Sequence, residues 1–114
     1  MIYALGALYT MKGATMPHDG VLPEEKAKIR RLVHAIIPDV TVYLYGSRAK
    51  GTSTIASDID LAIDAKTKLN PRIPAEIKSV LEGSFLLYAF DIVDLNAVSA
   101  DFRETIKKEA VLWK

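Results

Sequence analysis

The stretch from residue 43 to 64 constrains this 114-residue chain more than any other part of its sequence. It reads YLYGSRAKGTSTIASDIDLAID. An apolar run ends in Gly46 and Ser47, a short polar loop follows, and a second run opens on Asp58 and Asp60. The β-branched and aromatic residues before Gly46 predict a strand. The rest of the chain is interpreted as the scaffold that holds this stretch in place.

The turn that follows this strand has features of a phosphate-binding loop. Gly46 adopts backbone angles that other residues resist and lets a ligand approach the main chain. Ser47 opens a helical turn whose unpaired N–H groups suit phosphate oxygens. Arg48 and Lys50 add positive charge, and Gly51 closes the turn. The pattern alone leaves open whether these two cations meet phosphate or are simple surface charge.

The second run alternates from residue 58 to 64, which predicts a strand with acids on one face and apolar side chains on the other. Asp58 and Asp60 then lie within about 7 Å of each other and repel. One interpretation is a half-exposed strand whose acids face water. The other is a divalent cation, since magnesium takes one or two carboxylates together with substrate phosphates. The phosphate-suited turn just upstream favours the cation.

Gly46-Ser47, a gap of ten residues and Asp58-x-Asp60 together resemble the signature of the polymerase-β-type nucleotidyltransferases. More narrowly, the pattern is similar to the minimal nucleotidyltransferase group, whose small bacterial and archaeal members are antitoxins paired with HEPN-domain toxins. The resemblance covers residues 24–113. It implies an α+β fold in which a small mixed sheet has helices packed on one side.

The resemblance also implies the site. Asp58, Asp60 and Asp91 would be the catalytic and metal-binding carboxylates, with a pair of magnesium ions and ATP as substrate. The implied nucleotide-binding residues are Gly46, Ser47, Arg48, Lys50 and Ser57. Asp91 and Asp94 have opposite parity on their strand and so point to opposite faces. Asp91 matches the family's third carboxylate, whereas Asp94 is interpreted as a strand-end or loop acid.

The remaining pattern predicts the scaffold. Apolar spacing predicts helices over 23–37 and 74–82, and a final helix capped by Ser99 or Asp101. A further strand is expected over 90–95, and residues 111–113 are a terminal edge strand or a docking tail. One domain is expected from 21 to 114, preceded by an extension, 1–20, of uncertain order. Trp113 is interpreted as packing.

Composition excludes several classes. The chain has no cysteine, which excludes disulfides and thiolate metal sites and fits a cytoplasmic protein. Its net charge of +1 gives no general case for nucleic-acid or membrane binding. The apolar residues 1–10 are too few to span a bilayer. Lys26, Arg30 and His34 are interpreted as a solvated helix face.

Three functions follow from the resemblance and the residues. The first is an enzyme that transfers AMP from ATP to a tyrosine of a cognate HEPN ribonuclease toxin. The second is an antitoxin that inhibits its partner by occlusion without chemistry. The third is an aminoglycoside-type nucleotidyltransferase, although the chain has no room for the helical substrate domain of such enzymes. The sequence leaves the oligomeric state open, with a homo-oligomer or a hetero-oligomer as the alternatives.

Overall fold

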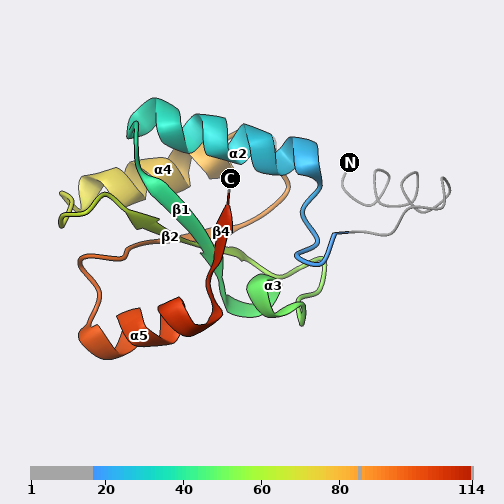
Figure 1. Cartoon of the computed structure of the whole chain (residues 1–114). Helices are drawn as coiled ribbons and strands as arrows, with labels where there is room; N and C mark the ends of the chain where they lie inside the picture. Colours follow the sequence, from blue (N-terminus) through green and yellow to red (C-terminus); the bar gives the residue numbers. More distant parts are fainter. Residues whose placement is uncertain (1–16, 85, 114) are drawn as a thin grey trace, which may run out of the picture.

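The computed structural model describes residues 17–84 and 86–113, which form one layered α+β unit (Figure 1). The elements in chain order are α2 (Pro23–Ile36), β1 (Thr41–Tyr45), α3 (Gly46–Lys50), β2 (Ile59–Asp64), α4 (Arg72–Glu82), β3 (Phe90–Asp94), α5 (Ala100–Glu109) and β4 (Val111–Trp113). The expected helices and strands are all present. Their ends differ from the predicted ones by one or two residues, as helix and strand ends commonly do.

The four strands form a mixed sheet in the order β3-β2-β1-β4. β1 pairs antiparallel with β2 and with β4, whereas β2 and β3 run parallel. In this register Asp60 lies between Tyr45 of β1 and Asp91 of β3. Because paired residues share a face of the sheet, these three side chains emerge on the same side.

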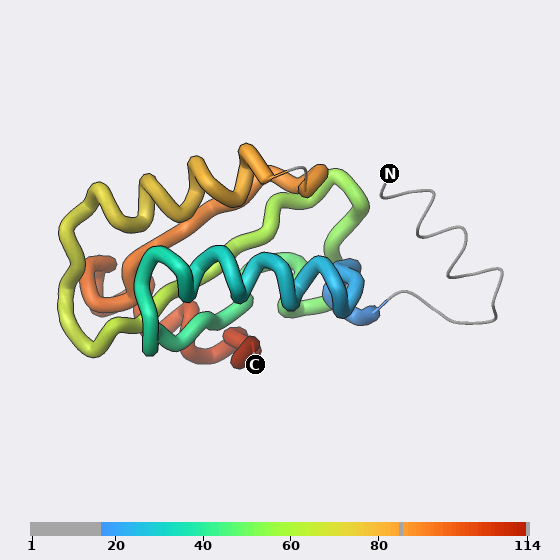
Figure 2. The backbone as a smooth tube through the Cα atoms, turned by 90° about the horizontal axis from the view of Figure 1, so that it is seen from above, coloured from blue at the N-terminus to red at the C-terminus, as the bar shows by residue number. Residues whose placement is uncertain are grey.

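Helices α2 and α4 lie side by side over one face of the sheet (Figure 2). The apolar stripe of α2 buries Ile29 and Val33, and α4 buries Ile77 and Leu81. They pack on the inward strand residues, and the core they form also contains Val42, Leu44, Ile59, Leu61, Ile63 and Phe90. This core accounts for the strict alternation of β2, since every second residue of that strand faces it.

Helix α5 lies on the opposite face, below the sheet in Figure 1. Its first turn is capped by Ser99, whose hydroxyl oxygen accepts a hydrogen bond from the N–H of Phe102. Ile106 packs with Tyr45 and Ala62 in a second, smaller core. The expectation that all helices lie on one side is therefore corrected, although the α+β class and the mixed sheet are confirmed.

The chain end forms an edge strand. β4 pairs with β1, and Trp113 is buried in the main core, as the packing interpretation predicted. Val111 and Leu112 stay about half exposed at this edge. Most of the predicted extension, residues 1–16, lies outside the described residues, but Asp19 and Gly20 contact the body of the domain. No helix among the described residues is long and apolar enough to cross a membrane.

Candidate active site

The site forms where β1 ends and the parallel strands β2 and β3 begin. Asp60 and Asp91 are register partners on these strands, so their carboxylates lie side by side. The hydroxyl of Tyr45 donates a hydrogen bond of 3.1 Å to Asp91 Oδ2. Asp58 is exposed just before β2. The topology thus brings together Asp60 and Asp91, which lie 31 residues apart in the sequence, and Asp58 precedes Asp60 by two residues.

The closeness of these acids changes the pKa values of the groups in the site. Burial, followed by the charges of Asp91 and Asp58, raises the pKa of Asp60 to about 6. Burial and the adjacent Asp91 raise the pKa of Tyr45 as well, so its hydroxyl stays a donor. A cation that binds beside neighbouring carboxylates offsets the repulsion between their negative charges. The acids therefore form a local concentration of negative charge that favours a divalent ion.

The fit of this site to magnesium was expected to rest on three carboxylates. Among residues 17–84 and 86–113, no group of three or more carboxylate, imidazole or thiolate side chains is arranged to hold a metal ion. Magnesium is often bound by one or two carboxylates plus phosphate oxygens. The adjacent Asp60 and Asp91 meet that smaller requirement, with Asp58 beside them. The three-carboxylate site stays a prediction.

The glycine turn lies directly against the acids. Gly46 has a φ of 74°, a left-handed conformation that other residues rarely adopt. A Cβ at this position would overlap the carboxylate of Asp60. Its N–H donates a 3.0 Å hydrogen bond to Glu109 Oε1 at the end of α5. Gly46 is thus required both by its backbone angles and by the closeness of Asp60.

Arg48 occupies a different place from the one predicted. It is 1% exposed, and its guanidinium lies over the ring of Tyr88, 5.1 Å from the centroid. Nε and Nη2 both donate to the carbonyl oxygen of Ser57, at 3.2 and 2.8 Å, and Nη1 donates to that of Asp19 at 2.9 Å. A guanidinium that is buried and bound to main-chain oxygens in this way is poorly placed to bind phosphate. We therefore correct its role: Arg48 holds the loop that leads into Asp58.

The other predicted nucleotide-binding residues lie around the turn. Lys50 is exposed and pairs with Glu109 at 3.1 Å. Ser47 is half-buried, and its carbonyl oxygen accepts from the N–H of Thr52 at 3.0 Å. Ser57 is the residue before Asp58, and its hydroxyl oxygen accepts from the N–H of Thr54 at 2.9 Å. Their contact with a nucleotide remains a prediction.

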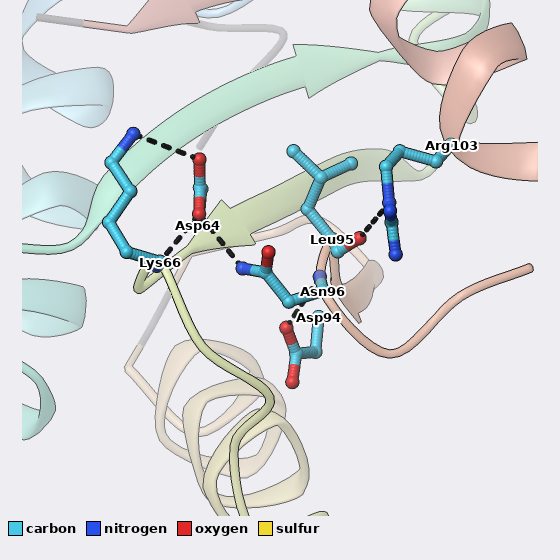
Figure 3. Close-up of polar contacts among 6 residues, drawn as sticks. All are labelled: Asp64, Lys66, Asp94, Leu95, Asn96 and Arg103. Carbon is cyan, nitrogen blue, oxygen red and sulfur yellow. Dashed lines mark hydrogen bonds and ion pairs between the residues drawn. The ribbon is translucent and has the colours of Figure 1, made fainter. Parts of the chain in front are cut away.

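Two acids, Asp64 and Asp94, lie at the other ends of β2 and β3 from this site. Figure 3 shows their polar contacts. Asp94 is buried and accepts hydrogen bonds from the backbone N–H groups of Leu69, at 2.7 Å, and Asn96, at 2.9 Å. Asp64 accepts from the Asn96 amide at 2.8 Å and pairs with Lys66. The interpretation of Asp94 as a strand-end or loop acid agrees with its position as the last residue of β3.

Sequence reasoning missed two residues of the site, Tyr45 and Glu109. Tyr45 was interpreted only as a strand former, although its position just before the glycine turn was a usable signal. Glu109 lies 63 residues from Gly46, and no spacing in the sequence links them. Only the path of α5 under the sheet brings Glu109 to the turn.

Comparisons with known proteins agree on one family. The family model described as "Polymerase beta, Nucleotidyltransferase" matches residues 35–113. A Haemophilus influenzae protein named "Probable protein adenylyltransferase MntA" is 36% identical over 89 residues, which cover 78% of each chain.

Solved structures match in the same region. A crystal structure of a toxin–antitoxin with AMP-PNP has a TM-score of 0.70 and 29% identity, covering 78% of this chain and 72% of that one. The structure of tri-AMPylated Shewanella oneidensis HEPN toxin in complex with MNT antitoxin has a TM-score of 0.63 and 26% identity. That match covers 78% of this chain and 68% of the other.

Proposed function

The chain belongs to the polymerase β nucleotidyltransferase family, and from this premise we propose that it transfers AMP from ATP to a tyrosine of a HEPN-domain toxin. The observation that carries the proposal is the juxtaposition of Gly46 with Asp60 and Asp91. The closeness of a glycine turn to a carboxylate pair supports an approach of phosphate to the main chain beside a bound cation. The cytoplasm is the proposed place of action, because the chain contains no cysteine.

The residues divide the work of binding as follows. Gly46 lets the triphosphate lie against the main chain, while Ser47 and Lys50 bind its outer phosphates. Asp60 and Asp91, with Asp58 beside them, would hold magnesium, which neutralises charge on the phosphates.

Two contacts keep the site in shape during transfer. Tyr45 fixes the orientation of Asp91, and Arg48 fixes the backbone ahead of Asp58. The acceptor hydroxyl then bonds to the α-phosphorus and loses its proton as pyrophosphate departs.

The proposed partner follows from the relatives. Two matched structures are described as toxin–antitoxin assemblies, one with AMP-PNP and one with a tri-AMPylated HEPN toxin. Specificity would then come from docking on a larger protein, in an interface of roughly 800 Å² on each side.

The test is incubation of the protein with its co-expressed HEPN partner, ATP and magnesium, followed by mass spectrometry. We expect AMP-sized adducts on tyrosine of the partner and little labelling of aminoglycosides or nucleic acid. Asp60→Asn should abolish the adducts while the two proteins still co-purify. A partner without adducts that is inhibited equally by the Asp60→Asn variant would support occlusion instead. Efficient labelling of an aminoglycoside would support the small-molecule alternative.

A further inference from the structure

Glu109 binds two groups that a triphosphate would need, the N–H of Gly46 and the ammonium of Lys50. Its Oε1 accepts the hydrogen bond from the N–H of Gly46 at 3.0 Å, and its Oε2 lies 3.1 Å from Lys50 Nζ. The Glu109 side chain is 19% exposed and the Lys50 side chain 56% exposed, so the carboxylate is the more buried partner of this ion pair. One carboxylate thus joins the end of α5 to both ends of α3.

This arrangement is difficult to reconcile with a free phosphate site. A backbone N–H is a single donor, and that of Gly46 is already used. The negative charge of Glu109 also lies near Asp60, where it adds to the effects of burial, Asp91 and Asp58. A triphosphate brought to this turn meets a carboxylate in the position that suits its own oxygens. Either Gly46 and Lys50 do not bind phosphate, or Glu109 leaves when they do.

We propose that Glu109 is an intramolecular stand-in for phosphate, which the outer phosphates of ATP displace from Gly46 and Lys50. This inference rests on the proposed function, since it assigns those two residues to the triphosphate. The exchange replaces one anion by another. The N–H of Gly46 and the ammonium of Lys50 therefore have an anionic partner both before and after ATP binds. The cost is the loss of the two Glu109 contacts, and it lowers the affinity of the protein for ATP.

Calorimetric titration of Glu109→Gln against the unaltered protein tests the proposal. Removing the charge should tighten binding of magnesium-ATP by about three- to fivefold, the range expected for a partly exposed ion pair. Binding of AMP, which lacks the outer phosphates, should change by less than twofold. Glu104→Gln, an exposed position on the same helix, is the matched control and should alter neither affinity.

Thermal unfolding separates this role from a purely structural one. Glu109→Gln should lower the melting temperature of the nucleotide-free protein, because α3 and α5 lose their link, and yet tighten magnesium-ATP. A structural or metal-binding role for Glu109 predicts the same sign for both: lower stability and weaker ATP binding. Equal or weaker ATP binding by Glu109→Gln overturns the inference. An unaltered protein that binds no ATP would instead overturn the proposed function.

A measurement on the unaltered protein is independent of any variant. The backbone amide resonance of Gly46 should shift when the protein is saturated with tripolyphosphate, as its acceptor changes from carboxylate to phosphate. Saturation that leaves the Gly46 resonance in place would show that Glu109 stays bound, and the proposal would be wrong.

Discussion

The Tyr45 hydroxyl reaches across a whole strand to bond Asp91. Tyr45 ends β1 and Asp91 lies near the start of β3, with β2 and its Asp60 between them. The 3.1 Å hydrogen bond therefore spans the strand that carries Asp60 and fixes the orientation of the Asp91 carboxylate. Groups that orient a metal-binding carboxylate affect function although they do not touch the ion.

Tyr45→Phe should keep the fold and lower the rate of AMP transfer. The ring stays packed against Phe102, so we expect a loss of stability of no more than about 1 kcal/mol. Without its donor Asp91 is free to rotate, and AMP transfer should fall roughly 10- to 100-fold, with more magnesium needed for half-maximal rate. Magnesium titrations of the labelling rate provide the measurement. Tyr43→Phe, on the same strand and face, is the control and should leave the magnesium requirement unchanged.

Asp60→Asn should stabilise the metal-free protein at high pH only. The pKa of Asp60 is raised from 3.8 in the unfolded chain to about 6 in the folded one, chiefly by burial and Asp91. The favourable effect of its protonated form is therefore complete below pH 4 and lost as pH rises through 6. Since the group is partly exposed, we expect a gain of roughly 1 kcal/mol for the variant at pH 8 and none at pH 4. Urea unfolding in chelator at both pH values checks this.

Asp64→Asn provides a comparison of opposite sign on the same strand. Burial works to raise the pKa of Asp64, but hydrogen bonds from Asn96 and Lys66 outweigh it and lower the pKa below its ordinary value. The stability that this carboxylate contributes is present above its unfolded pKa and is lost as pH falls through the folded one. Asp64→Asn should therefore destabilise the protein at pH 8. A stabilised variant would contradict this account of the strand.

Arg48→Ala should be among the most destabilising single changes in the chain. It removes a buried guanidinium from main-chain acceptors at Asp19 and Ser57 and from the ring of Tyr88. We expect a loss of about 3–5 kcal/mol, measured by urea unfolding. Arg48→Lys should recover little, because an ammonium cannot reproduce the planar fork. Arg31→Ala, at an exposed position, should change stability by less than about 0.5 kcal/mol.

Asp91→Asn should lose AMP transfer, whereas Asp94→Asn should lose stability. Asp91 is exposed beside Asp60, so its variant should melt near the unaltered temperature and lose transfer on the scale of Asp60→Asn. Asp94 is buried on two backbone N–H groups, so its variant should lose about 1–2 kcal/mol of stability and keep most of its transfer rate. Melting curves and labelling rates for both variants decide the matter. Equal loss of transfer would contradict the strand register.

The scaffold was largely predictable because its signals are local. The apolar residues at every second position from 59 to 63 indicate the face of β2 that packs on the main core, and the apolar spacing after Pro23 indicates the face that α2 buries. The side on which α5 packs is a different matter. It depends on where the chain turns after β3, and nothing in the periodicity of α5 distinguishes the two faces of a sheet.

The site was predictable in part. A glycine turn and an acid pair at fixed spacing specify Gly46, Asp58 and Asp60, because that chemistry lies within one hairpin. Arg48 was assigned to phosphate because its charge is visible in the sequence and its burial is not. Glu109 was missed because its role comes from a contact between distant segments.

The contacts of Arg48 with the loop before Asp58 have a consequence for the side chains that this loop can carry. It grips main-chain oxygens, so it does not depend on which side chains the loop carries. Ile55, 64% exposed at the tip of that loop, can be exchanged for any residue that tolerates its backbone angles, and the carboxylates behind it keep their places. Substitutions at this position can thus change the exposed surface of the loop without moving the carboxylates that follow it.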